Sequence, residues 1–160
     1  MINQVALCKL ITANNRDIVN LKEKGFQYCN GYMMAECDYV MGKVVSKLFK
    51  VGALTIGKEL KSNRELDLMK ILEPTEEIPA FKTDYLRQAG YATACVFKAG
   101  EKYYLYNKTF VDVFEGVTYT ATFDGEKAIL RVYQGTELQG VILNMRIKQD
   151  IKTEMQQFEA

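Results

Sequence analysis

The residue types that most often carry out enzymatic chemistry are scarce in this sequence. It contains no histidine, so Ser-His and Cys-His pairs are excluded, and so is the usual general base near neutral pH. The only serines are Ser46 and Ser62, and Ser62 is better explained as the cap of a predicted helix. No glycine-rich phosphate loop is present. We therefore expect a protein that is not an enzyme and that has no catalytic residues and no cofactor.

Two sets of residues have side chains that can bind a metal ion. Glu36 and Asp38 lie two positions apart on a predicted strand, so their carboxylates face one side and could share a divalent ion or a proton. Four cysteines could together hold zinc. The acids lack further ligands and the cysteines lack Cys-x-x-Cys spacing, so we favour a solvated sheet face and buried free thiols. The cysteines are Cys8, Cys29, Cys37 and Cys95.

The overall composition is that of one globular domain. The chain has 160 residues and 48% hydrophobic content, enough to bury a sizeable core. Twenty-one basic and twenty acidic residues leave a net charge near zero, so no global field attracts nucleic acid or anionic lipid. Any site for a polyanion must be local.

One local excess of positive charge lies between residues 43 and 70. This segment has seven basic and three acidic residues, and helices with such a surface can touch DNA phosphates without reading sequence. A solvated helix face is the other interpretation. The candidate DNA-binding residues are Lys43, Lys47, Lys58, Lys61, Arg64 and Lys70.

The aromatic residues of the C-terminal half allow a second nucleic-acid hypothesis, a stacking platform for single strands. Residues 74–160 contain ten basic and twelve acidic side chains, so no basic groove accompanies the rings. We favour cross-strand pairs and core packing for them. The residues are Tyr103, Tyr104, Tyr106, Phe110, Phe114, Tyr119, Phe123 and Tyr133.

The first half of the chain predicts both strands and helices. A strand is expected over 5–12, followed by a short helix that begins at Asn14 or Asn15 and ends at Gly25. Asn30 and Gly31 predict a hairpin turn. A second helix is expected over 63–73, from its Ser62 and Glu65 capping box to Pro74.

The second half is expected to be mostly strands. The stretch 73–81 holds both prolines and predicts a connector, and a short helix is expected over 83–90. Strands follow over 91–98, 101–108, 109–114, 117–123, 128–133 and 140–147, with turns at 99–100 and 124–125. Ile151, Met155 and Phe158 have helical spacing, so the tail predicts an amphipathic helix buried against the last strands or a partner subunit.

The order of elements is similar on the two sides of the connector. We therefore expect an α+β fold, a pseudo-duplicated domain in which each half packs a helix on an antiparallel sheet. One domain would cover 1–147, with halves at about 1–75 and 80–147, and the tail helix would cover 148–160.

Three stretches resemble parts of a DNA sliding clamp domain of the bacterial type. They are "FQYCNGYMMAECDYVMGKV" for an early hairpin, "GALTIGKELKSNRELDLMKIL" for a strand leading into a DNA-facing helix, and "AILRVYQGTELQGVILNMRI" for the closing hairpin. The resemblance implies a clamp-like fold, contact with the phosphate backbone of duplex DNA and a role as a replication accessory factor. Replication proteins or further copies of the chain would be its partners.

A small protein-interaction module or inhibitor that binds a protein and not DNA is the alternative function. The start of the chain lacks the features of a signal peptide, and no apolar run approaches the length of a membrane span. We therefore expect a cytoplasmic protein with no membrane partner and no small-molecule substrate.

Overall fold

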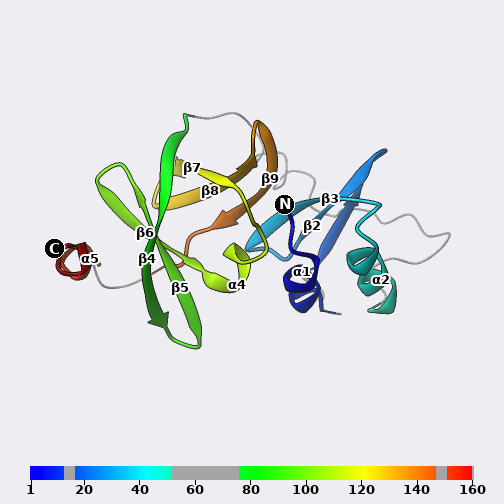
Figure 1. Ribbon diagram of the computed structural model, residues 1–160, viewed down its shortest axis with the longest axis horizontal. Coiled ribbons are helices and arrows are strands. Elements are labelled where there is room, and N and C mark those ends of the chain that lie inside the picture. The colour runs from blue at the N-terminus through cyan, green and yellow to red at the C-terminus, as the bar shows by residue number, and fades with distance from the viewer. Residues whose placement is uncertain (13–16, 52–75, 147–150, 160) are drawn as a thin grey trace.

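The computed structural model describes residues 1–12, 17–51, 76–146 and 151–159 (Figure 1). Within these ranges the chain forms four helices and a nine-stranded antiparallel sheet, so the expectation of a mixed fold is confirmed. The helices are α1 (Gln4–Leu10), α2 (Gly42–Lys50), α4 (Lys108–Val111) and α5 (Lys152–Glu159). The strands are β1 (Ile18–Leu21), β2 (Gly25–Cys29), β3 (Met33–Asp38), β4 (Ile78–Ala89), β5 (Ala92–Ala99), β6 (Lys102–Asn107), β7 (Thr118–Asp124), β8 (Lys127–Gln134) and β9 (Glu137–Leu143).

Strand β9 joins the N-terminal strands to the rest of the sheet. The strand order is β1-β2-β3-β9-β8-β7-β4-β5-β6, so β9 pairs with β3 on one side and with β8 on the other. Just after β9, Met145 forms an isolated antiparallel bridge with Leu105 of β6, and its N–H donates to the Leu105 carbonyl at 2.7 Å. The part of the sheet from β9 to β6 therefore curls until its two ends meet.

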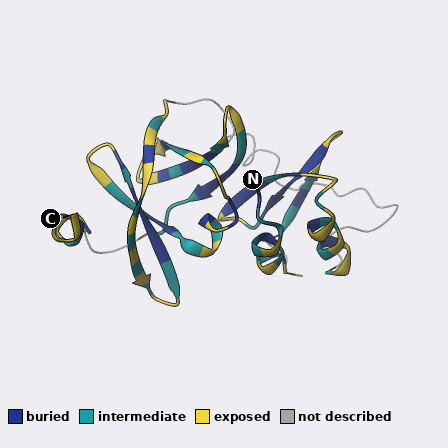
Figure 2. Cartoon of the chain, viewed as in Figure 1, coloured by how far each residue is buried: buried dark blue, intermediate teal, exposed yellow. Residues whose placement is uncertain are grey.

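Helices α1 and α2 cover one face of β1–β3 (Figure 1). Successive strand residues point to opposite faces, and alternate residues such as Phe26 and Tyr28 belong to the core beneath the helices. Leu7 of α1 and Val44 and Leu48 of α2 are fully buried in the same core. The other sides of the helices are largely exposed (Figure 2).

The tail forms the expected amphipathic helix. Ile151 and Met155 are buried against Ala94, Val96 and Leu105, which confirms that the tail packs on its own sheet. These residues belong to β5 and β6, so the expectation that the tail packs on the last strands is wrong. Only Met145, just after β9, packs against the same cluster. Phe158 stays half exposed, with its ring 4.8 Å from that of Tyr85 on β4.

The three expected hairpins are confirmed, although each turn begins one residue later than expected, at Gly31, Gly100 and Gly125. Gly31 has φ +92°, and the side-chain oxygen of Asn30 accepts the N–H groups of Tyr32 and Met33 at 3.0 Å. Gly100 and Gly125 also have positive φ angles, between β5 and β6 and between β7 and β8. Each glycine takes a backbone conformation that an L side chain resists.

Two expectations for the first half are wrong. Residues 5–12 do not form a strand, because Asn3 caps α1 by accepting the Ala6 N–H at 3.0 Å and helical spacing buries Leu7 and Ile11 together. The region after Asn14 and Asn15 forms β1 and not a helix, because Val19 enters the core as β1 pairs with β2. Helix α2 was not expected.

Two expectations for the second half are also wrong. Residues 83–90 extend β4, because pairing with β5 through the turn at Gly90 outweighs their helical propensity. The expected strand 109–114 contains α4 instead, and Asn107 caps it by accepting the Thr109 N–H at 3.0 Å. The connector is shorter than expected, because β4 begins at Ile78.

The expected helix over 63–73, with Ser62, Glu65 and Pro74, lies outside the described residues. The similarity of the two halves stays a prediction for the same reason. In the part of the chain that the structure describes, no helix is long and apolar enough to cross a membrane.

Candidate nucleic-acid interface

Helices α1 and α2 form a layer that contains lysines and no acidic residue. Their sequences are QVALCKL and GKVVSKLFK. Lys43, Lys47 and Lys50 all lie on α2, and Lys43 and Lys47 are four residues apart, so they share one side of the helix. Val44 and Leu48 anchor the adjoining side in the core. The packing of α2 leaves Lys43 and Lys50 exposed and Lys47 half buried.

Contacts between the two helices hold the start of α2 in place. The Lys43 N–H donates to Oε1 of Gln4 at 3.2 Å, and Sγ of Cys8 donates to the Lys43 carbonyl at 3.4 Å. Burial raises the pKa of the Cys8 thiol, although Lys47 and Lys43 oppose the shift. Cys8 therefore acts as a neutral contact beneath the lysines and not as a reactive thiolate.

The structure places two of the predicted DNA-binding residues and adds one. Lys43 and Lys47 lie together on α2, whereas Lys58, Lys61, Arg64 and Lys70 lie outside the described residues. Lys50 lies with them on α2, in its last turn, where a positive charge interacts favourably with the helix dipole. Lys50 lies within the basic segment of the sequence. It could have been named as a candidate only if the helix over 42–50 had been predicted.

The candidate carboxylate pair has separate partners. Glu36 accepts a hydrogen bond from the Gln27 amide and lies 3.3 Å from the Lys22 ammonium. Asp38 accepts the Val40 N–H at 3.0 Å in the turn after β3. Within the described ranges, no group of three or more acidic or cysteine side chains could hold a metal ion.

The cysteines are free thiols, as expected. Cys29, Cys37 and Cys95 are buried and Cys8 is half buried. Burial raises the pKa of Cys37 to about 12, with Glu36 and Asp38 adding to the shift. Burial also raises the pKa of Cys95, so the Cys37 and Cys95 thiols are protonated at neutral pH.

Most of the aromatic residues of the second half pack together. The ring of Phe97 contacts those of Tyr106 and Tyr119 edge to face, with centroids 5.2 and 4.9 Å away. Tyr104 and Phe123 form another pair at 5.7 Å. Tyr106 is buried and Tyr119 is half buried, which confirms core packing for these two rings, whereas Phe123 stays 43% exposed.

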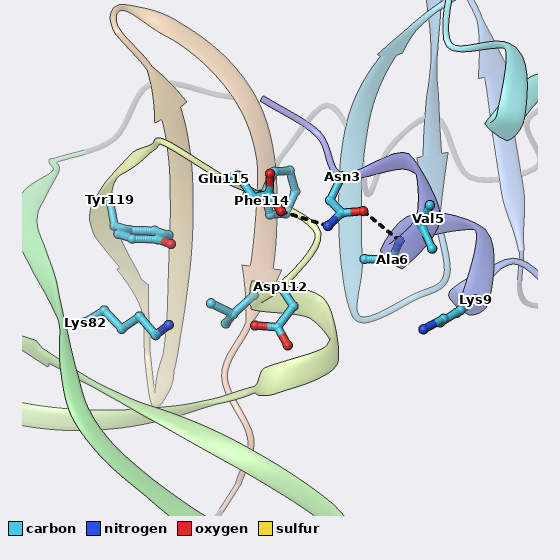
Figure 3. Close-up of a pocket in the computed structure, with 10 residues that line it drawn as sticks. Asn3, Val5, Ala6, Lys9, Lys82, Asp112, Phe114, Glu115 and Tyr119 are labelled. Atoms are coloured by element: carbon cyan, nitrogen blue, oxygen red, sulfur yellow. Dashed lines mark hydrogen bonds between the residues drawn. The ribbon is translucent and has the colours of Figure 1, made fainter.

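A groove lies between α1 and the segment that contains α4, on a different surface from the lysines of α2 (Figure 3). Its volume is about 480 Å³. Lys9 lies on the α1 side, and Lys82 of β4 and Tyr119 of β7 lie on the opposite side (Figure 3). The sequence did not predict this groove, because its walls come from the start, middle and later part of the chain. Its lining is Asn3, Val5, Ala6, Lys9, Lys82, Val111, Asp112, Phe114, Glu115 and Tyr119.

The charged residues of the groove differ in their partners. Oε1 of Glu115 accepts the Asn3 amide at 2.8 Å, and Oδ2 of Asp112 lies 2.6 Å from the Lys108 ammonium. Among the described side chains, Lys9 and Lys82 form no ion pair. The lining therefore contains two basic and two acidic side chains, of which only Asp112 is paired with a cation, the Lys108 ammonium.

Comparison of the chain with protein-family models, with curated proteins and with solved structures gives no match in any of the three.

Proposed function

We propose that this chain is a non-enzymatic, DNA-associated protein that contacts the phosphate backbone of duplex DNA through α2. The observation that carries the proposal is the acid-free layer of α1 and α2, with Lys43, Lys47 and Lys50 on α2. The resemblance of three stretches to a bacterial sliding clamp domain supports the same role. The finer proposal is a clamp-like, pseudo-duplicated domain that serves as a cytoplasmic replication accessory factor.

The physical basis of the contact is electrostatic. Lysine ammonium groups bind phosphates as point charges and release condensed counterions, so the binding is indifferent to base sequence and sensitive to salt. Val44 and Leu48 hold α2 on the sheet, so its backbone need not fold on binding. A few contacts of this kind produce weak binding, which suits a protein that associates with DNA without reading it.

The double substitution Lys43→Glu/Lys47→Glu is expected to abolish retention on duplex DNA at low ionic strength. It replaces two attractive charges with two repulsive ones beside the phosphates. Exposed Lys43 tolerates the change within about 0.5 kcal/mol, and half-buried Lys47 keeps a long polar side chain as glutamate. Fluorescence anisotropy of a labelled duplex of arbitrary sequence measures the effect, and circular dichroism checks the fold.

The matched control is Lys102→Glu/Lys127→Glu. Both lysines are exposed at hairpin turns, so this variant changes the net charge equally without touching α2. Retention close to that of the unmodified protein is expected. Equal loss of binding in both double variants would mean that net charge, and not α2, governs the association.

The second candidate function is a protein-interaction module, favoured by exposed apolar side chains on the β4–β5 hairpin. The side chains of Phe81, Leu86 and Tyr91 are 66, 47 and 109% exposed. Another copy of the chain is one partner that could cover them. Absence of duplex binding at low salt, together with a concentration-dependent mass that Phe81→Ser lowers, would favour this function over DNA association.

A further inference from the structure

We infer that the exposed side of α2 binds single-stranded DNA more tightly than duplex DNA, with Phe49 stacked on an unpaired base. The inference rests on the proposed contact between α2 and phosphates, and it names the form of DNA that this surface prefers. The evidence is the position of Phe49 beside the lysines of α2 and the exposure of its ring.

The exposed side of α2 is a small patch centred on Ser46. Residues three and four positions apart are neighbours on a helix surface, so Ser46 lies next to Lys43, Phe49 and Lys50. All four residues are exposed. This Ser46 patch therefore combines an aromatic ring, two positive charges and a hydroxyl group within about two turns of helix.

Phe49 contributes little to holding α2 on the sheet. Its side chain is 45% exposed, whereas Val44 and Leu48 are fully buried. Among the residues that the structure describes, the Phe49 ring contacts no other aromatic ring. Lys43 and Lys50 form no ion pair within the same ranges. The ring and both charges are therefore accessible to a ligand.

A single strand of DNA offers both kinds of group that the Ser46 patch can bind. Its phosphates attract the lysines, and the Ser46 hydroxyl can donate a hydrogen bond to a phosphate oxygen. Its bases are unpaired, so one of them can stack on the Phe49 ring, a contact that every base can make. Within duplex DNA the bases are paired and stacked on one another, which leaves only the phosphates for α2. Stacking on Phe49 therefore favours the single strand.

The surface of an anionic membrane is another ligand that attracts lysines beside an apolar side chain. A helix that lies in a membrane surface buries a broad apolar face there. In α2 the apolar face is already used, because Val44 and Leu48 are buried in the protein core. Within the described residues of α2, Phe49 is the one large apolar side chain that is exposed. The patch therefore suits a single base better than a lipid surface.

The test compares a single-stranded oligonucleotide of mixed sequence with a duplex of the same length. Fluorescence anisotropy at low ionic strength measures both affinities for the full chain. The single strand is expected to bind about fivefold more tightly, because a gain of about tenfold from stacking is partly offset by the lower charge density of a single strand. Phe49→Ala is expected to weaken binding of the single strand about tenfold and to leave duplex binding unchanged.

Further variants separate stacking from other effects of the substitution. Phe49→Tyr keeps an aromatic ring and should bind the single strand as the unmodified protein does. Phe49→Leu keeps an apolar side chain without a ring and should bind as weakly as Phe49→Ala. Phe81→Ala is the matched control, because it removes a phenylalanine that is 66% exposed on β4, and it should change neither affinity.

The inference is overturned if the single strand binds no more tightly than the duplex, or if Phe49→Ala or Phe49→Leu binds it as the unmodified protein does. Loss of binding to anionic lipid vesicles in Phe49→Ala, without loss of single-strand binding, would assign the patch to a membrane surface instead. Salt-sensitive duplex binding without a preference for the single strand would overturn this inference and leave the proposed function standing. Phe49-dependent binding of the single strand without any duplex binding would do the reverse.

Discussion

Replacing Gly140 with alanine is expected to lower the melting temperature by about 10 °C, a loss of roughly 3 kcal/mol. Gly140 lies in β9 opposite Ala35 of β3 and Val132 of β8. A Cβ atom at this position would collide with the Met34 carbonyl oxygen and the Phe114 ring. Hydrogen-bonded strands on both sides of β9 prevent the backbone from moving away. The change therefore strains the strand that joins the two parts of the sheet.

Gly42→Ala is the matched control for this prediction. Gly42 begins α2, and a Cβ there would meet no atom within 4 Å. Alanine also favours a helix more than glycine does, so this variant should melt at or above the temperature of the unmodified protein. Thermal unfolding followed by circular dichroism compares the two. If the two variants have the same melting temperature, Gly140 is not packed as closely between β3 and β8 as the structure indicates.

Replacing Met155 with aspartate is expected to release α5 from the sheet. Met155 is fully buried and packs with Ala94, Val96 and Leu105. Loss of the buried side chain alone costs about 2 kcal/mol or more, and an unpaired carboxylate there adds a desolvation penalty. An isolated helix of eight residues is marginal in water, so released α5 should also unfold. Once α5 is released, the aspartate is no longer buried, so the loss of stability cannot exceed the free energy with which α5 docks on the sheet.

Hydrogen exchange and limited proteolysis measure this release directly. Amides of residues 152–159 should lose protection, and Ala94, Val96 and Leu105 should become exposed, with a lower melting temperature. Gln156→Asp adds the same charge at the exposed neighbouring position and should change neither readout. Unchanged protection in Met155→Asp would mean that α5 does not pack on β5 and β6. Deletion of 149–160 should lower the melting temperature for the same reason.

The hairpins could be predicted from the sequence because their turns depend on local chemistry. Gly31, Gly100 and Gly125 take positive φ angles that other residues resist, and the side chain of Asn30 accepts backbone N–H groups of the turn that follows it. The tail helix could be predicted because Ile151 and Met155 share one side of it. Its contacts with β5 and β6 depend on how the sheet curls, so the tail's own sequence does not encode them.

The short elements α1, β1 and α4 could not be predicted reliably from hydrophobic pattern. Seven residues of α1 contain apolar spacing that fits either a strand or a helix, and its cap at Asn3 decides between them. Strand β4 has only one fully buried residue, Ala80, so it lacks the pattern of a core strand. Its conformation depends on pairing with β5 and β7, and this pairing cannot be read from the sequence of β4 alone.

The candidate surfaces were predictable to different degrees. The charge of the basic segment singled out Lys43 and Lys47, although the helix that presents them was not expected. The groove joins Lys9, Lys82 and Tyr119, which are far apart in the chain. Only the folding of β4 and β7 opposite α1 brings these residues to one site.

The salt dependence of duplex binding tests DNA association through α2 most directly. Each phosphate contact contributes about −0.9 to the slope of log affinity against log salt concentration. Contacts from Lys43, Lys47 and Lys50 predict a slope near −3 or steeper, and Lys43→Gln/Lys47→Gln should make it shallower by about 1.8. The same slope in both proteins, or no binding of duplex to the unmodified protein at low salt, would contradict the proposed function.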